Sequence, residues 1–455
     1  MKFLKLNRFI LIAIFILFIF IYAINGDSYQ YSFVLFVPLC FIISIFLETK
    51  LYSKYTLILK IIYVLSIFKF FIMPLMIVAT DDIRSYGPNP TSQSFIYAII
   101  ITILEIFTLL FAKILFFNNK RKKLKINLYT KWFTKNISIK FGLLILLLVF
   151  FIVTNRELLM PKDIFSERTF DDDIISVKNS LAIVAKWIKL IGFPIISLFL
   201  YRFFNKKTAY YLSIIAFVFF GYLQLGTSRW TLIFYSVISF LFLYKLFGNK
   251  VKKVAIPISV VLTFVVLSIS IYKFSWAIQD SSTPFKDVIL VMSGQFQQYF
   301  SGPTLIAQSI DITNYSALSN KIGIETFIND YMGSVPLLSS TFEQSNRINY
   351  IFNEYIFGIR TSNQTQIIPM SGMGYIYFGL FGSTIFVFMF TYFGLKFEEF
   401  ATQSKDIINY WLLMYMAIWC GCALIFSTQV VWGNLIANYA VLYLINNLIN
   451  KMKIN

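Results

Sequence analysis

The sequence predicts an all-α, polytopic membrane protein with about twelve transmembrane helices. Of the 455 residues, 58% are hydrophobic and 13% are charged, about half the charged fraction of an average soluble domain. Apolar runs long enough to cross a bilayer recur along the chain. Because the backbone groups of a spanning segment must be satisfied within lipid, such runs are expected to form helices.

Twelve apolar runs have spanning length, and each is justified by its own hydropathy. The first is followed by YAINGDS, which lacks a small-residue cleavage site, so we expect it to be a span rather than a signal peptide. The predicted spans are 9–24, 31–47, 57–79, 94–117, 138–154, 181–201, 208–226, 230–247, 254–272, 372–394, 409–426 and 430–449.

Basic residues are distributed unevenly between the segments that join these spans. With the N-terminus in the cytoplasm, the cytoplasmic segments hold 23 of the 40 Lys and Arg residues, and the external segments hold 11. External segments hold 16 of the 21 acidic residues. The positive-inside rule therefore predicts that both termini are cytoplasmic. It also explains the formal charge of +19 without a nucleic-acid partner.

The predicted spans divide the chain into three parts. Residues 1–272 hold spans one to nine, with short external loops at 80–93 and 155–180. Residues 273–371 form one large external loop, and residues 372–455 hold spans ten to twelve. Loops of such length are usually functional. We expect the large loop to fold into a helical cap over the spans, with the chemistry beneath it.

Residue usage excludes several kinds of chemistry. The chain has no histidine, which excludes His-based catalysis and His-ligated metal. Its cysteines, Cys40, Cys420 and Cys422, lie within apolar spans and predict neither a disulfide framework nor a zinc site. Asp81 and Asp82 could hold a metal at the outer face, but an acidic pair in a turn is common. We expect no metal and no cofactor.

Arginine and lysine follow different rules in this chain. Six of nine arginines fall in external segments, but only five of 31 lysines do. Arginine offers a planar fork that binds phosphate or carboxylate through two hydrogen bonds, which favours an external site for a lipid-linked diphosphate or an acidic sugar. The alternative is that each arginine pairs with a nearby acid or a lipid head group. The six are Arg84, Arg156, Arg168, Arg229, Arg347 and Arg360.

Two local patterns single out candidate residues. Arg229, in the tight turn LQLGTSRW, is expected at the membrane surface beside a helix N-terminus, where an anion is favoured. In the large loop, Glu343, Arg347, Tyr350 and Glu354 share one stripe of a predicted helix. Pairing of Glu343 with Arg347 would be an ordinary helical ion pair, which leaves Glu354 as the better candidate base.

Lys69 and Glu105 are two of the charged residues that fall inside predicted spans. Lys69 lies near the middle of span three and Glu105 near the middle of span four. Neighbouring spans run antiparallel, so the two side chains are expected at similar depth. We expect them to pair, because pairing offsets the burial cost of each charge. The alternative is a role in proton transport.

The whole chain resembles the bacterial O-antigen and capsule repeat-unit polymerases. The resemblance rests on about a dozen spans, the large external loop late in the chain, the GTSR turn at 226–229, and the segment PMSGMGYIYFG at 369–379. It implies a membrane glycosyltransferase related to the class C type. Such an enzyme acts at the outer side of the bacterial inner (cytoplasmic) membrane, without a cofactor.

The resemblance also implies a reaction and partners. A growing glycan would pass from undecaprenyl diphosphate to the terminal sugar of a new lipid-linked unit, and a chain-length regulator could be a protein partner. Arg229, Arg347 and Arg360 would hold the diphosphates, with Arg84, Arg156 and Arg168 more loosely matched. Glu354, or else Glu343, would be the base.

Other classes of function remain open at this point. A flippase or transporter of the same lipid-linked sugars would show charged residues along its spans and short loops on both sides. A non-catalytic assembly protein would tolerate loss of the external arginines. A metal-dependent class C glycosyltransferase would lose activity on chelation.

Overall fold

Every regular element that the structure describes is helical, as the sequence predicts. The structure is a computed structural model. The residues it describes are 2–24, 30–51, 56–84, 87–118, 136–161, 180–225, 229–254, 257, 264, 285–333, 335, 342, 346–358 and 366–452.

The helices of the first half are mostly long and apolar. They are α1 (Lys2–Ile24), η1 (Ser32–Leu35), α2 (Phe36–Leu51), α3 (Leu57–Ile67), η2 (Phe68–Ile72), α4 (Met73–Thr80), α5 (Ser92–Asn118), α6 (Ile137–Thr154), α7 (Arg156–Leu159), α9 (Ser180–Phe203), α10 (Lys206–Leu223), α11 (Arg229–Phe247) and η3 (Gly248–Val251).

Shorter helices precede a second set of apolar helices in the other half. They are α13 (Phe285–Tyr299), α14 (Pro303–Asn314), α15 (Ser316–Ser319), α16 (Ile324–Met332), α17 (Ile348–Phe357), α18 (Met370–Gly382), α19 (Ile385–Gln403), α20 (Ile407–Gly421), α21 (Thr428–Asn434), η6 (Leu435–Ala440) and α22 (Val441–Lys451).

Five continuous helices in the described part are long and apolar enough to cross a membrane, and a bent pair would make six. The five are Leu57–Thr80, Ser92–Asn118, Ile137–Thr154, Leu181–Phe203 and Trp230–Val254, and each coincides with a predicted span. Shorter apolar helices occupy Phe9–Phe20, Ser32–Glu48 and Ile407–Gly421, where three further spans are predicted. Predicted span 254–272 lies almost wholly outside the described residues. The protein is thus of the helical membrane type, while the count of twelve and the orientation stay predictions.

The predicted span 372–394 is not one straight helix. It falls on α18 and α19, whose axes differ by 108°. Gly379 has φ +69°, a conformation that glycine adopts without steric cost. A Cβ at Gly374 would lie 2.0 Å from the carbonyl oxygen of Ser383, so α18 folds tightly against the turn. Gly374 and Gly379 of the 369–379 segment therefore serve the bend between α18 and the following apolar helix.

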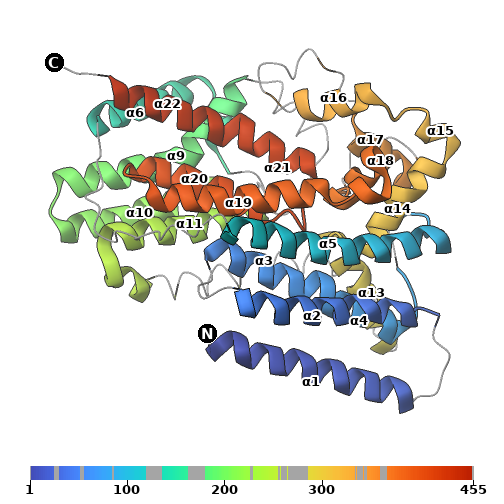
Figure 1. Cartoon of the computed structure of the whole chain (residues 1–455). Coiled ribbons are helices and arrows are strands. Elements are labelled where there is room, and N and C mark those ends of the chain that lie inside the picture. Colours follow the sequence, from blue (N-terminus) through green and yellow to red (C-terminus); the bar gives the residue numbers. More distant parts are fainter. Residues whose placement is uncertain are drawn as a thin grey trace.

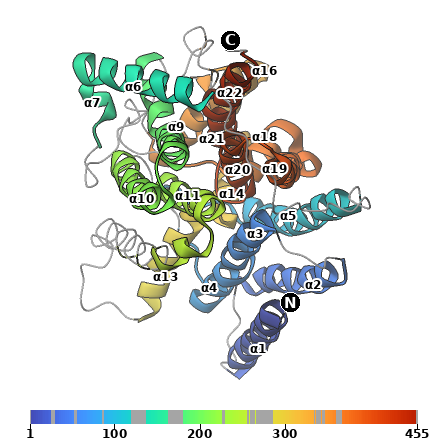
Figure 2. The same cartoon turned by 90° about the vertical axis from the view of Figure 1, so that its left-hand side faces the viewer.

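Helix α20 forms the centre of the bundle. Every residue from Ile407 to Gly421 is buried. It packs against α19, α11, α3, η6 and α22, and Figure 2 shows it surrounded by helices from both halves of the chain. The connection to α21, residues 422–427, is buried as well. Non-helical backbone at such a position is tolerated because protein surrounds it.

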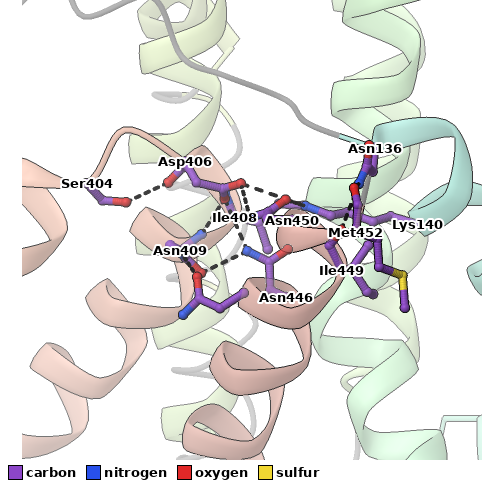
Figure 3. Close-up of polar contacts among 11 residues, drawn as sticks. Asn136, Lys140, Ser404, Asp406, Ile408, Asn409, Asn446, Ile449, Asn450 and Met452 are labelled. Carbon is purple, nitrogen blue, oxygen red and sulfur yellow. Dashed lines mark hydrogen bonds and ion pairs between the residues drawn. The ribbon is translucent and has the colours of Figure 1, made fainter. Parts of the chain in front are cut away.

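A polar network joins α6, α20 and α22 at the end of the bundle where α1 begins and α22 ends (Figures 1 and 3). Asp406 caps α20 by accepting hydrogen bonds from the backbone amides of Ile408 and Asn409, each at 2.8 Å. The same carboxylate accepts from Asn450 at 2.9 Å and Asn446 at 3.3 Å. Lys140 of α6 lies 3.7 Å from it. This network closes the bundle at that end.

The helices α13 to α17 occupy two different parts of the molecule. Helix α13 packs against α4, and α14 packs against α5 and α18. Helices α15, α16 and α17 gather at the end of the molecule opposite the N and C labels of Figure 1. Part of the predicted external loop therefore lies alongside apolar helices, an arrangement that its length and composition do not reveal.

Candidate functional site

A buried carboxylate, Asp330, organises the polar contacts at the end of the bundle opposite the termini. One carboxylate oxygen, Oδ2, accepts a hydrogen bond from the hydroxyl of Tyr377 at 2.5 Å. The other, Oδ1, accepts from the backbone amide of Ile348 at 3.0 Å and from the side-chain amide of Gln429. Asp330 itself is fully buried. Four segments far apart in the sequence thus meet at one acid.

Local sequence explains how each segment reaches the site. Asp330 lies near the end of α16. The start of this helix is fixed by the Thr326 hydroxyl, which accepts a hydrogen bond from the Gly323 amide and donates one to the Lys321 carbonyl oxygen. Gln429 lies in the first turn of α21, after the capping hydroxyl of Ser427. Tyr377 lies on α18, two residues before Gly379, the glycine with positive φ at the bend. The bend therefore brings the tyrosine to Asp330.

Arg347 lies beside this acid. Its Nε is 4.0 Å from Asp330 Oδ1, and its Nη2 donates to the Asp330 carbonyl oxygen at 3.1 Å. Its side chain is 16% exposed, whereas that of Asp330 is 0% exposed. Arg347 is the residue before the first turn of α17, with φ −88° and ψ 146°. The prediction that Arg347 lies within this helix is therefore wrong, because α17 begins at Ile348.

The environment changes the ionisation of both groups. Burial raises the pKa of Asp330 to about 7, even though Tyr377, Arg347, Ile348 and Gln429 all favour the charged form. Burial likewise lowers the pKa of Arg347, and the Asp330 carboxylate opposes that change. An acid with a pKa near 7 can exchange a proton at neutral pH, as a general base must.

Aromatic rings surround the acid. Phe327 lies 5.0 Å from the Tyr377 ring and 4.8 Å from the Tyr331 ring, measured between centroids. Trp432 donates its indole N–H to the carbonyl oxygen of Tyr331 at 3.2 Å. Tyr377 is therefore held both by these rings and by its hydrogen bond to Asp330.

The predicted base Glu354 lies on α17 and forms an ion pair with Lys321. The Lys321 Nζ atom is 2.8 Å from Oε1 and 3.0 Å from Oε2. The Lys321 side chain is 40% exposed, and the Glu354 side chain is 24% exposed. Tyr350, on the same helix, is half-buried. Glu354 therefore lies in a more exposed setting than Asp330.

The predicted arginines are not all gathered at one place in the described structure. Arg84 and Arg156 are exposed, the first after α4 and the second on α7. The backbone of Arg229 begins α11. Glu343, Arg168 and Arg360 lie outside the described residues. Of the predicted site residues whose side chains the structure describes, Arg347 is the one that contacts Asp330, at 4.0 Å or less.

The predicted Lys69–Glu105 pair is confirmed. Lys69 Nζ lies 2.8 Å from Glu105 Oε2 and 3.0 Å from Oε1, with both side chains 1% exposed. Lys69 also donates to the carbonyl oxygen of Leu424, in the buried connection after α20, at 3.3 Å. Lys69 belongs to η2, a π-helical turn. Such turns are frequent at functional sites.

Sequence reasoning missed Asp330 and Gln429. Asp330 stands among ordinary polar residues in IETFINDYMG, and its neighbours give no periodic or spacing signal. Gln429 follows a Ser-Thr pair that predicts a helix start, yet nothing in that pattern points to an acid 99 residues away.

The fold and this site define the protein only as an all-α protein of the membrane type with a buried acid–arginine centre at one end. No family model matches the chain, and no curated protein or solved structure is similar to it at a significant level.

Proposed function

We propose that this protein is a membrane glycosyltransferase that polymerises lipid-linked oligosaccharide repeat units. The observation that carries the proposal is the contact between Arg347 and Asp330, a diphosphate-binding type of residue beside an acid with a pKa of about 7. A carboxylate tuned toward neutrality beside an arginine is the minimum that glycosyl transfer from a diphosphate needs in a chain without histidine.

The reaction follows from these groups. The hydroxyl of the acceptor sugar attacks the anomeric carbon of the donor, and the bond from that carbon to the diphosphate oxygen breaks. The hydroxyl proton passes to a carboxylate, and the electron pair passes to the leaving diphosphate. The Arg347 guanidinium stabilises the charge on the diphosphate.

Asp330 is the carboxylate that the geometry favours as base. Glu354 is held by Lys321 in a partly exposed ion pair. In contrast, Asp330 has the raised pKa of a buried acid. In its resting contacts Asp330 also orients Arg347, so the acceptor hydroxyl would replace one of the present donors.

Complementation of a strain that lacks this protein tests the proposal. The glycan length is compared for wild type, Arg347→Lys and Asp330→Asn. Arg347→Lys keeps the charge but loses the fork, so we expect single repeat units with either variant while the protein still reaches the membrane. Arg202→Lys makes the same replacement on the last turn of α9 and should restore long chains.

Long chains with Arg347→Lys would remove the arginine from the mechanism. A metal requirement is tested in the same assay, because chelation should leave polymerisation intact. If chelation abolished it, a metal-dependent glycosyltransferase would replace the polymerase described above.

One observation favours the flippase as a second candidate. The Lys69–Glu105 pair lies at a π-helical turn and touches the carbonyl of a buried helix break, and charged groups at such breaks are typical of transporters. The two functions differ in the strain that lacks the protein. A polymerase defect leaves single units on the outer face, whereas a flippase defect leaves none there.

A further inference from the structure

Helices α13 and α14 form a hairpin with a tight turn that lies among apolar helices, and its arms pack mainly on α4 and on α5 and α18. The turn residue Ser301 has φ +51°, which is uncommon for a residue with a side chain and marks a strained position. The Gly302 amide donates to the Gln297 carbonyl oxygen at 2.7 Å, and the Gln297 side-chain oxygen accepts from Thr304 N at 2.8 Å. Gln297 therefore closes the turn from both sides.

Contacts along the hairpin fix its depth. In the second half of α13, a Cβ at Gly294 would lie 3.2 Å from the carbonyl oxygen of Arg84, which follows α4. At the turn, the Phe300 ring stacks on Phe68 with centroids 4.8 Å apart. Phe68 precedes Thr80, the last residue of α4, by twelve positions, or about 18 Å at the helical rise.

The second arm, α14, contacts the same connection between α4 and α5. Asp311, near the end of α14, accepts hydrogen bonds from Thr91 N at 3.0 Å and Thr91 Oγ1 at 2.8 Å, just before α5. Gln308 donates to the Pro88 carbonyl oxygen at 3.0 Å. Residues on both sides of the turn, Gly294 and Asp311, thus contact the connection between α4 and α5, and the turn itself reaches the middle of α3–α4.

Four polar side chains at this hairpin are buried, and each has a polar atom with no hydrogen-bond partner among the described residues. Ser293 is 0% exposed, and Gln297, Ser301 and Thr304 are each 1% exposed. The atoms are the three hydroxyl oxygens and the Gln297 side-chain nitrogen. Leaving such groups without a partner is costly, and apolar replacements would fit an apolar bundle better.

We propose that the α13–α14 hairpin is a re-entrant element that forms a binding site, reached from the α4–α5 end, for a neutral group rich in hydroxyl and carbonyl oxygens, such as a sugar ring. All four unpartnered atoms can donate hydrogen bonds, and the three hydroxyls can also accept, so a ligand with hydroxyl and carbonyl oxygens can satisfy all of them. The four residues carry no charge, which disfavours a diphosphate as their ligand. The site goes beyond the Arg347 site, and only the choice of saccharide probe below rests on the proposed polymerase activity.

Thiol accessibility tests the site without an activity assay. Ser301→Cys is placed in a chain whose native cysteines, Cys40, Cys420 and Cys422, are replaced by Ala. Right-side-out membrane vesicles are treated with a charged, membrane-impermeant methanethiosulfonate. The control is Thr102→Cys on α5, a buried hydroxyl residue whose oxygen already donates to Ala98 O at 2.7 Å.

We expect Ser301→Cys to react at least ten times faster than Thr102→Cys. Equal rates, or reaction only in inside-out vesicles, would overturn the proposed outward-facing site. Thermal unfolding of each variant shows that it is folded. These results do not depend on whether the protein polymerises glycans, so failure of the polymerase proposal is recognised separately.

Protection from the same reagent identifies the ligand class. The probes are a synthetic polyprenyl diphosphate carrying a disaccharide and the same polyprenyl diphosphate without sugar. We expect the first to slow modification at least fivefold and the second to leave it unchanged. Equal protection would assign the site to the lipid diphosphate, and no protection would leave only water as the partner; either result overturns the proposal.

A second variant keeps the test independent of the cysteine substitution. Thr304→Val preserves shape and removes one unpartnered hydroxyl. We expect this variant in the Ser301→Cys chain to lose the disaccharide protection while its midpoint of thermal unfolding stays the same or rises. A lowered midpoint with unchanged protection would mean that Thr304 has only a structural role.

Discussion

Lys69 Nζ lies 2.8 Å from Glu105 Oε2, and both side chains are 1% exposed within helices apolar enough to cross a membrane. Each charge is satisfied mainly by the other, with one further acceptor at Leu424 O. Removing one partner therefore leaves a buried charge without compensation, whereas removing both does not.

Lys69→Met should accordingly lower the free energy of unfolding by about 3–5 kcal/mol, the typical cost of breaking a buried pair. The double variant Lys69→Met with Glu105→Gln should recover most of that loss. Thermal or denaturant unfolding in detergent measures both. If the double variant is as unstable as the single one, the pair is not the source of the effect.

Asp330 predicts a pH dependence of stability. Its pKa is about 7 in the folded protein and near 3.8 in the unfolded chain, so the folded state binds more protons between these values. Stability should fall as pH rises from about 4 to about 7, by at most about 1.4 kcal/mol per pH unit, and level off above.

Asp330→Asn removes this proton, so its unfolding free energy should vary less between pH 5 and pH 7 than that of wild type. The comparison uses the slope, because the amide also changes the contact with Tyr377 at every pH. An unchanged slope would place the titrating group elsewhere.

Variants of Glu354 and Lys321 test whether Glu354 has a structural or a catalytic role. Their pair is partly exposed, and pairs of this kind contribute about 0–1 kcal/mol. Glu354→Gln and Lys321→Met should therefore each change stability by no more than that, and both should support long glycan chains. Loss of chain length with Glu354→Gln alone would return the base to Glu354, as the sequence stripe predicts.

Gly374 is required for the bend between α18 and α19. Gly374→Ala puts a methyl group 2.0 Å from a backbone oxygen of Ser383, so the turn must move and the midpoint of thermal unfolding should fall. Gly142→Ala on α6 is the matched control, because a Cβ there meets nothing within 4 Å. That variant should be neutral or gain up to about 1 kcal/mol from helix propensity.

Asp406 should be the most sensitive residue of the network in Figure 3. Asp406→Ala removes a helix cap worth about 0.5–2 kcal/mol and also leaves Asn446, Asn450 and Lys140 short of an acceptor. A loss of at least 2 kcal/mol is expected in denaturant unfolding. The neighbouring Lys405→Ala, at an exposed position, is the control and should have little effect.

The sequence could predict features that follow from the position of a residue along an apolar run. Lys69 and Glu105 pair because two neighbouring apolar runs place them at equal depth, and that depth follows from counting residues. The helical class and the five long apolar helices follow from composition in the same way.

Apart from Arg347, the candidate site could not be predicted, because it depends on contacts between segments far apart in the sequence. The helix stripe through Arg347 ignores Asp330, whose carboxylate accepts from Ile348 N and fixes where α17 begins. Periodicity also misses the bend after Tyr377, since the apolar run continues through it. Asp330 becomes notable only when Gln429 and Tyr377 meet it.

The central position of α20 has a consequence for biogenesis. Its residues 407–421 are all buried, yet α3, α9, α11 and α19, which pack around it, precede it in the chain. Since synthesis proceeds from the N-terminus, the surrounding helices must wait, incompletely packed, for the helix that fills the space between them. A chain truncated before residue 407 would lack the central helix of the bundle. The bundle can therefore be completed only when nearly the whole chain has been synthesised.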